Sequence, residues 1–182
     1  MAKWTTETFE TDNNLEIIDE IMTTYGQEIL QLVYSYVNNK ELAEDLTQDI
    51  FVKCYHTLHT FKGKSKFRTW LWQIAINTCK DYLKSWYNKN VVHSTEDFLF
   101  DIGQKDSVED AIIQQDRDAR LVSSIMQLPI KYREVIYLYY FEELRIKEIS
   151  NLVKVKQNTI KTRLRKAKEL IKKEMEADYN GK

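Results

Sequence analysis

The residues whose types could carry chemistry gather in one short stretch near the end of the chain. Residues 151–168, NLVKVKQNTIKTRLRKAK, hold seven basic side chains and no acidic one, although the whole chain has a formal net charge of only -1. Clustered Lys and Arg attract phosphates, and Asn, Thr and Arg can read the edges of bases. Charge alone is equally consistent with a solvated helix face. The spacing of the apolar residues has to separate the two interpretations.

That spacing predicts two helices, over residues 145–153 and 157–175, joined by only three residues. Helices so closely joined cross steeply, and the small Ser150 lets their backbones approach, which is the helix-turn-helix arrangement. Basic helices that bind calmodulin or membrane surfaces need neither the short preceding helix nor the tight turn. We therefore expect the far side of the second helix to enter a major groove of DNA. Its residues are Asn158, Thr159, Lys161, Thr162, Arg165, Lys166 and Lys173.

A second basic region, residues 53–89, carries eight basic side chains and one acidic one. Its predicted helix buries Phe67, Leu71, Ile74, Thr78 and Tyr82, and a basic loop, KGKSK at 62–66, precedes it. Aromatic and basic groups interleave on a separate stripe, which is how single-stranded nucleic acid is commonly held. Tryptophans at helical spacing are also common in cores, so that interpretation stays open. The stripe comprises Trp70, Gln73, Asn77, Lys80 and Lys84.

The helix predicted before it, over 41–60, has a face of mixed character. Its core stripe is Leu42, Leu46, Ile50, Cys54 and Leu58. The opposite face combines acidic, amide and apolar groups, as protein interfaces do, although single exposed apolar residues are also ordinary. That face comprises Asp45, Gln48, Asp49, Val52 and Tyr55.

The chain as a whole is predicted to be all-α, since it has one proline, four glycines and apolar residues at helical spacing almost throughout. Residues 89–106 lose that spacing, and residues 94–118 hold eight acidic and two basic side chains. We therefore expect two small helical domains, 1–88 and 107–182, joined by an acidic linker over 89–106. Pro129 should begin a helix. The expected helices are 14–38, 41–60, 66–88, 107–126, 130–141, 145–153 and 157–175.

Catalysis and membrane passage find little support in the sequence. No run of about 18 apolar residues and no signal-peptide pattern occurs, so we expect a cytoplasmic protein without membrane insertion. Cys54 lies near His56 and His59, but this set lacks a fourth metal ligand. Glycine-rich phosphate loops and the serine or metalloprotease motifs are absent. We expect no enzyme, no catalytic residues, no bound metal and no cofactor.

Four blocks of the sequence resemble the extracytoplasmic-function (ECF) sigma factors of bacterial RNA polymerase, in that family's order and spacing. They are AEDLTQDIF at 43–51, FKGKSKFRTWLWQIAINTCKDYLK at 61–84, LPIKYREVIYL at 128–138 and EISNLVKVKQNTIKTRLRKAKELI at 148–171. The resemblance implies a two-domain factor that joins core polymerase, directs it to specific promoters and initiates transcription. It also implies an anti-sigma factor as a partner. A stand-alone helix-turn-helix regulator that senses a ligand is the alternative.

The resemblance also implies roles for individual residues. The helix with Asp45, Gln48, Asp49, Phe51 and Val52 is similar to the surface that docks on the polymerase clamp. Lys62, Lys64 and Lys66 with Arg68, Trp70, Gln73, Asn77, Lys80 and Lys84 are similar to the region that opens the minus-ten element and captures a flipped base. Residues from Lys156 to Lys166 are similar to the reader of the minus-thirty-five element. Lys154 stands where the family usually has glycine, and a left-handed conformation there would cost about 1 kcal/mol.

Overall fold

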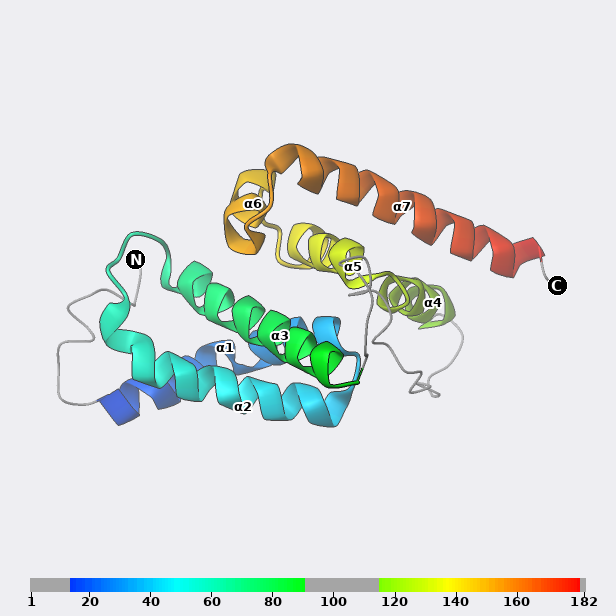
Figure 1. Ribbon diagram of the computed structural model, residues 1–182. Coiled ribbons are helices and arrows are strands. Elements are labelled where there is room, and N and C mark those ends of the chain that lie inside the picture. The colour runs from blue at the N-terminus through cyan, green and yellow to red at the C-terminus, as the bar shows by residue number, and fades with distance from the viewer. Residues whose placement is uncertain (1–13, 91–114, 181–182) are drawn as a thin grey trace. The chain divides into compact units, whose positions relative to one another are not determined.

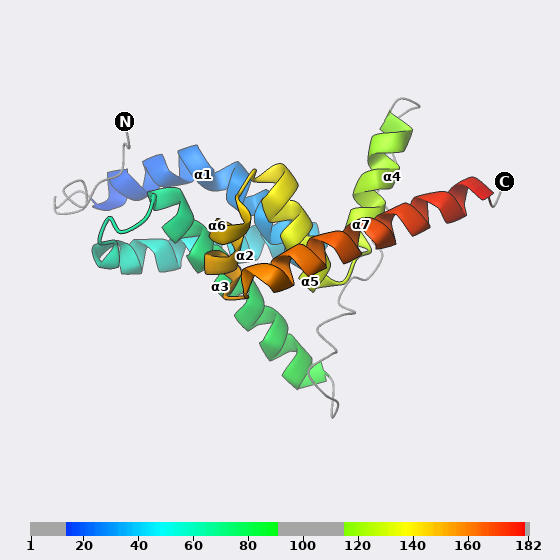
Figure 2. The same cartoon turned by 90° about the horizontal axis from the view of Figure 1, so that it is seen from above.

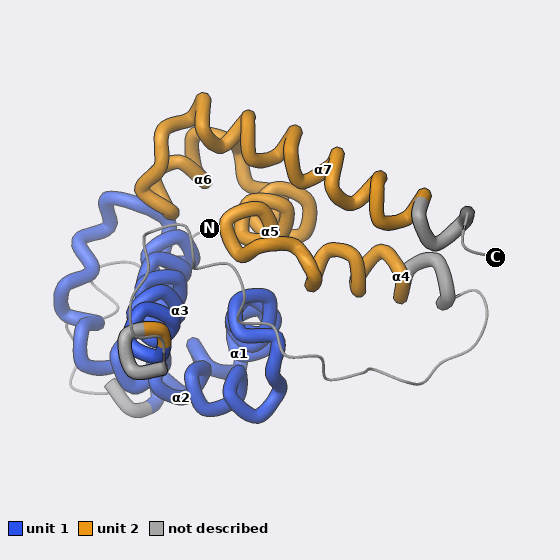
Figure 3. Tube along the Cα trace, turned by 45° about the vertical axis from the view of Figure 1, so that its right-hand side comes forward, with its two compact units in different colours: residues 1–86 blue, residues 87–182 orange. Residues whose placement is uncertain are grey.

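The computed structural model describes residues 14–90 and 115–180, and no strand occurs among them (Figure 1). The predicted all-α class is confirmed. The chain divides into two compact units, Met1–Trp86 and Tyr87–Lys182 (Figure 3). The predicted linker, 89–106, lies outside the described residues except for its first two, which belong to a helix. In the part of the chain that is described, we find no helix long and apolar enough to cross a membrane.

The first unit consists of three long helices, α1 (Asn14–Val37), α2 (Lys40–Thr57) and α3 (Phe67–Asn90), with a short 3-10 turn, η2 (Leu58–Thr60), after α2. Successive helices run in opposite directions (Figure 1). Asn38 ends α1 with a φ of 50°, a left-handed conformation that Asn tolerates. Asn39 then caps α2, because its Oδ1 accepts a hydrogen bond of 2.8 Å from the backbone N–H of Leu42.

The core of the first unit draws on all three helices. On α2 the expected stripe is buried at Leu46, Ile50, Cys54 and Leu58, with Leu42 half-buried. On α3, Ile74 and Tyr82 were predicted to be buried but are only half-buried. The helix has neighbours on two sides: Lys53 of α2 donates to Thr78, and Tyr25 of α1 packs on Phe67. A wider apolar face is therefore covered, which adds Trp72, Ala75, Ile76, Cys79 and Leu83 to the core.

The second unit contains α4 (Gln115–Met126), α5 (Ile130–Ile136), α6 (Ile146–Val153) and α7 (Gln157–Asn180). Pro129 caps α5 as its carbonyl accepts hydrogen bonds from Tyr132 and Arg133. The helix predicted over 130–141 continues past α5 as a π-helical turn, η4 (Tyr137–Phe141). The stretch 107–114 of the helix predicted over 107–126 lies outside the described residues. Figure 1 and Figure 2 both show α6 against the first turns of α7.

Two buried ionic side chains fix α5 within this unit. Arg133 is 2% exposed and its guanidinium donates to the carbonyl of Met126 at the end of α4. Glu134, 4% exposed, lies 3.8 Å from the guanidinium of Arg163 on α7. Because buried charges are costly unless they are paired, these contacts hold α4, α5 and α7 in one arrangement. Apolar packing of Ile149, Leu152 and Val153 against Ile160, Leu164 and Ala167 joins α6 to α7.

Candidate functional site

The turn between α6 and α7 sets the position of the basic helix. Lys154 has a φ of 60° and a ψ of 40°, so this non-glycine residue does adopt the left-handed conformation. The backbone N–H of Val155 donates to the carbonyl of Ser150 at 3.2 Å, and the Ser150 hydroxyl donates to the carbonyl of Val155 at 2.6 Å. These bonds close the end of α6 in a Schellman-type cap. Ser150 is therefore small enough to let α6 and α7 approach each other, and it also stabilises the turn through its hydrogen bonds.

All of the side chains predicted to face duplex DNA are exposed on the N-terminal half of α7 or just before it. The carboxylate of Glu169 lies 3.9 Å from Arg165 and 3.3 Å from Lys166, and both cations stay more than half exposed. Such exposed pairs contribute little and are readily exchanged for phosphate contacts. The exposed set is Lys156, Asn158, Thr159, Lys161, Thr162, Arg165 and Lys166, with Lys173 also exposed farther along the helix.

The structure adds residues that the sequence patterns missed. A shallow cleft of about 430 Å³ lies between α5 and the exposed face of α7, with Lys131 and Tyr132 on the α5 side. Lys131 thus extends the basic surface, since its side chain and Arg165 line the same cleft. Arg163, by contrast, forms an ion pair with the buried Glu134. Neither role could be assigned from periodicity, because each depends on how α5 packs against α7.

The basic loop and the stripe on α3 lie next to each other in the first unit. Lys62, Lys64 and Lys66 are all exposed, and the positive φ of 66° at Gly63 turns the loop between them. Asn77 is exposed one turn after Gln73, and the Gln73 Nε2 donates to the Asn77 Oδ1 at 3.0 Å. That bond orients the Asn77 amide so that its NH₂ group points away from Gln73. Lys80 is half-buried and Lys84 exposed farther along the stripe.

Trp70 has a mixed position, half-buried at the edge of an aromatic cluster. Its ring centroid lies 5.5 Å from that of Phe61 and 5.4 Å from that of Phe67. Both of those phenylalanines are buried. Packing on two sides fixes the indole while leaving part of it accessible, which suits a rigid platform for a base.

Arg68 is tied into the first unit. Its Nε lies 3.0 Å from Oε2 of Glu28 on α1, and its guanidinium carbon lies 4.5 Å from the centroid of the buried Trp72 ring. The side chain is about a third exposed. The ion pair with Glu28 joins the start of α3 to α1, and the direct DNA contact of Arg68 stays a prediction.

The mixed face of α2 is accessible as expected, with one exception. Asp45, Gln48 and Asp49 are exposed, and the apolar Val52 is 55% exposed. Phe51, however, is 4% exposed, so its side chain lies in the interior and not on this face, and its contact with the polymerase stays a prediction. The helix α2 packs against α1 and is joined to α3 by the hydrogen bond from Lys53 to Thr78, so more than one of its sides is covered.

The geometry does not support a metal site at Cys54, His56 and His59. Cys54 is fully buried, whereas His56 and His59 are exposed. Burial raises the pKa of the Cys54 thiol to about 12, which disfavours the thiolate that metals bind. Among the residues that the structure describes, no three His, Cys, Asp or Glu side chains are grouped to hold a metal ion.

Comparison with known proteins identifies both units. Residues 21–87 match the family model of sigma-70 region 2, and residues 118–171 match that of sigma-70 region 4. The chain is 32% identical to the ECF RNA polymerase sigma factor SigW of Bacillus subtilis over 163 residues, which covers 86% of this chain and 87% of the relative. It is also 32% identical to the RNA polymerase sigma-H factor of Pseudomonas aeruginosa over 165 residues, covering 87% and 86%.

The fold has a solved counterpart as well. The sigma factor RpoE of Bartonella quintana, determined in complex with the anti-sigma factor NepR, superimposes with a TM-score of 0.66 at 17% identity, covering 88% of this chain and 97% of that one. The two family models fall on the two compact units, and the relatives match over most of their length. The chain therefore belongs to the extracytoplasmic-function sigma factors of bacterial RNA polymerase.

Proposed function

We propose that this sigma factor joins core RNA polymerase through the exposed face of α2 and initiates transcription at promoters that its two units read. Asp45, Gln48 and Asp49 are exposed one and two turns before the exposed Val52. A small apolar contact within a rim of acidic groups suits a basic helical partner, since charge steers the encounter and apolar burial retains it. Asp49 adjoins the buried Ile50 and Phe51, so its backbone is well fixed.

The α3 surface is proposed to hold the opened minus-ten element. Lys62, Lys64 and Lys66 would follow the phosphates of the single strand, while Trp70 stacks on a base. The side chain of Asn77 is oriented by its hydrogen bond from Gln73. Its amide can donate to and accept from the hydrogen-bonding edge of a flipped base. Lys80 and Lys84 continue the phosphate path, and Arg68 keeps the start of α3 on α1.

The exposed face of α7 is proposed to read the minus-thirty-five element in duplex form. Asn158, Thr159 and Thr162 can reach base edges from the first turns of the helix. The four cations Lys156, Lys161, Arg165 and Lys166 are placed for phosphates, with Lys131 from α5 beside them. Four neutralised phosphates predict a slope of about -3.6 for log K against log salt concentration.

A protein partner and a cellular location complete the proposed function. An anti-sigma factor that covers the DNA-binding and polymerase-binding surfaces is proposed as the regulator, supported by the fold shared with a sigma factor solved in such a complex. The protein is proposed to act in the cytoplasm, where the polymerase is, and to perform no catalysis of its own. Family membership over both units carries the proposal.

A reconstitution tests it. Purified chain and core polymerase are incubated with a library of linear genomic fragments, and the 5′ ends of run-off transcripts are sequenced. We expect discrete start sites that share upstream motifs and that depend on the added chain. The double variant Asp49→Lys with Arg165→Ala is the matched control and should lower the yield of these transcripts by at least about tenfold. A stand-alone regulator would bind fragments without creating start sites, and that result would reject the proposal.

A further inference from the structure

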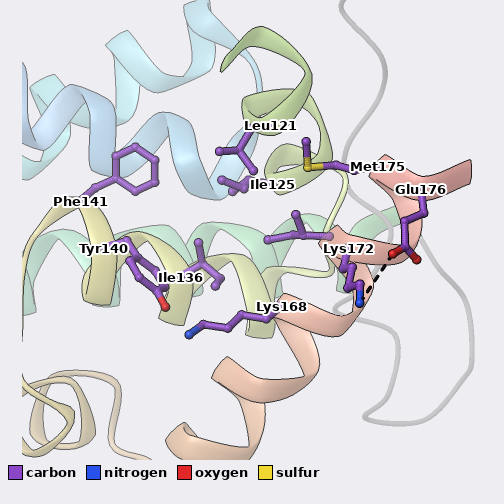
Figure 4. A pocket seen from close by; sticks show the side chains of 10 residues that line it. Leu121, Ile125, Ile136, Tyr140, Phe141, Lys168, Lys172, Met175 and Glu176 are labelled. Carbon is purple, nitrogen blue, oxygen red and sulfur yellow. Dashed lines mark ion pairs between the residues drawn. The ribbon is translucent and has the colours of Figure 1, made fainter. Parts of the chain in front are cut away.

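The second unit carries an open apolar groove that lies outside the surfaces proposed above (Figure 4). Its volume is about 710 Å³. Phe141 is 56% exposed and Tyr140 47% exposed, which is unusual for neighbouring large aromatic residues. Because α4, η4 and α7 each contribute a wall, the groove is a feature of the packed unit. Its apolar lining includes Leu121, Ile125, Ile136, Tyr140, Phe141 and Met175.

The rim of the groove is positively charged. Lys168 and Lys172 of α7 both line it, with one acidic residue, Glu176, which lies 3.6 Å from Lys172. The ammonium group of Lys168 lies 5.2 Å from the centroid of the Tyr140 ring. A hydrogen bond with Tyr140 raises the pKa of Lys168. An apolar floor with a basic rim fits a segment that combines large apolar residues with acids.

One segment of the same chain has this composition. Residues 96–102, EDFLFDI, contain three acidic and four large apolar side chains, and they lie outside the described residues. Residues 103–114 separate them from Gln115, the first residue of α4, and a dozen residues span up to about 40 Å. Leu121 lies only about 9 Å farther along α4. The connection is therefore long enough for the segment to reach the groove.

We propose that residues 96–102 dock in this groove when the protein is free, with Phe98 and Phe100 against the apolar floor and the carboxylates toward Lys168 and Lys172. A short tether gives an effective concentration of the order of millimolar, so even a weak intrinsic affinity fills the groove. Any outside protein that uses the groove must then displace the segment. This inference does not depend on the proposed promoter and polymerase contacts.

A spin label in the full-length chain tests the docking. Thr95→Cys supplies the attachment site, because Cys54 and Cys79 are both buried and do not compete for the reagent. With methyl-labelled methionine and isoleucine, we expect the label to broaden the NMR signals of Met175 and Ile171. The double variant Phe98→Ala with Phe100→Ala should lower the docking constant at least about tenfold, because each ring loses its burial. Val91→Ala with Val92→Ala is the matched control and should leave the broadening intact.

A change on the other side of the contact completes the test. Phe141→Glu introduces a charge at an exposed position, so the unit should stay folded by circular dichroism while the broadening disappears. Absence of broadening in the unmodified labelled chain would overturn the proposal, as would equal broadening in both double variants. Broadening that arises only between labelled and unlabelled copies would overturn it too, since the occupant would then be a second molecule.

Discussion

The left-handed turn at Lys154 provides a quantitative test of how the two helices of the second unit are held. A residue with a Cβ costs about 1–2 kcal/mol in this conformation. Glycine avoids that cost, but it increases the conformational entropy of the unfolded chain, which lowers stability by about 0.4–1 kcal/mol. The bonds from the backbone of Lys154 and Val155 to Ser150 do not involve the Lys154 side chain. Lys154→Gly should therefore stabilise the second unit by about 0.5–1 kcal/mol.

The position of the tryptophans makes this measurable by thermal unfolding. All four tryptophans precede residue 87 in the sequence, and the three among the described residues, Trp70, Trp72 and Trp86, lie in the first unit, so tryptophan fluorescence is used to follow that unit. Circular dichroism reports on both units. For a domain of this size, the expected gain raises the midpoint of the second unit by about 2–8 °C. The fluorescence midpoint should not move.

Two variants isolate the backbone effect. Lys154→Ala removes the same charge but keeps the Cβ, so it should give no comparable gain. Asn151→Gly places glycine at an exposed position inside α6 and should cost about 0.3 kcal/mol, since Asn is itself a poor helix former. If Lys154→Gly behaves like Lys154→Ala, or lowers the midpoint, then the turn is not strained and the reasoning from its φ is wrong.

The remaining predictions concern the binding surfaces and the buried ion pair. Asp49→Lys should weaken the affinity for core polymerase by about tenfold without changing the unfolding midpoint, as measured by fluorescence anisotropy and thermal melting. Asn77→Ala should slow promoter opening, followed by permanganate footprinting, while closed-complex affinity is kept; intact opening would remove Asn77 from the assigned surface. Arg165→Ala should weaken duplex binding and reduce the salt slope by about 0.9, and an unchanged slope would show that Arg165 makes no phosphate contact. Glu134→Gln should destabilise the second unit by about 1–2 kcal/mol in urea unfolding followed by circular dichroism, because Arg163 loses its partner in a partly exposed site. Glu169→Gln, at an exposed ion pair, is the control and should change stability by less than about 0.5 kcal/mol.

Much of the helical organisation could be predicted because it is encoded locally. Apolar residues three and four positions apart define a helix and its buried side without reference to the rest of the chain. The prediction of α6, the three-residue turn and the start of α7 agrees with the structure for this reason. The exposure of Asn158 and Arg165 follows from the same geometry, since they lie opposite the apolar stripe of their own helix.

The sequence by itself thus determined the helix class, the helix-turn-helix and the faces that carry charge. The tertiary structure alone decided what depends on a second neighbour. Phe51 is buried because α2 is covered on more than one side, and Arg68 is tied to Glu28 because α1 passes beside α3. Lys131 joins the basic cleft because α5 packs on α7. A periodic pattern records which side of a helix is apolar, but partners distant in the sequence decide how much of the remaining surface they cover.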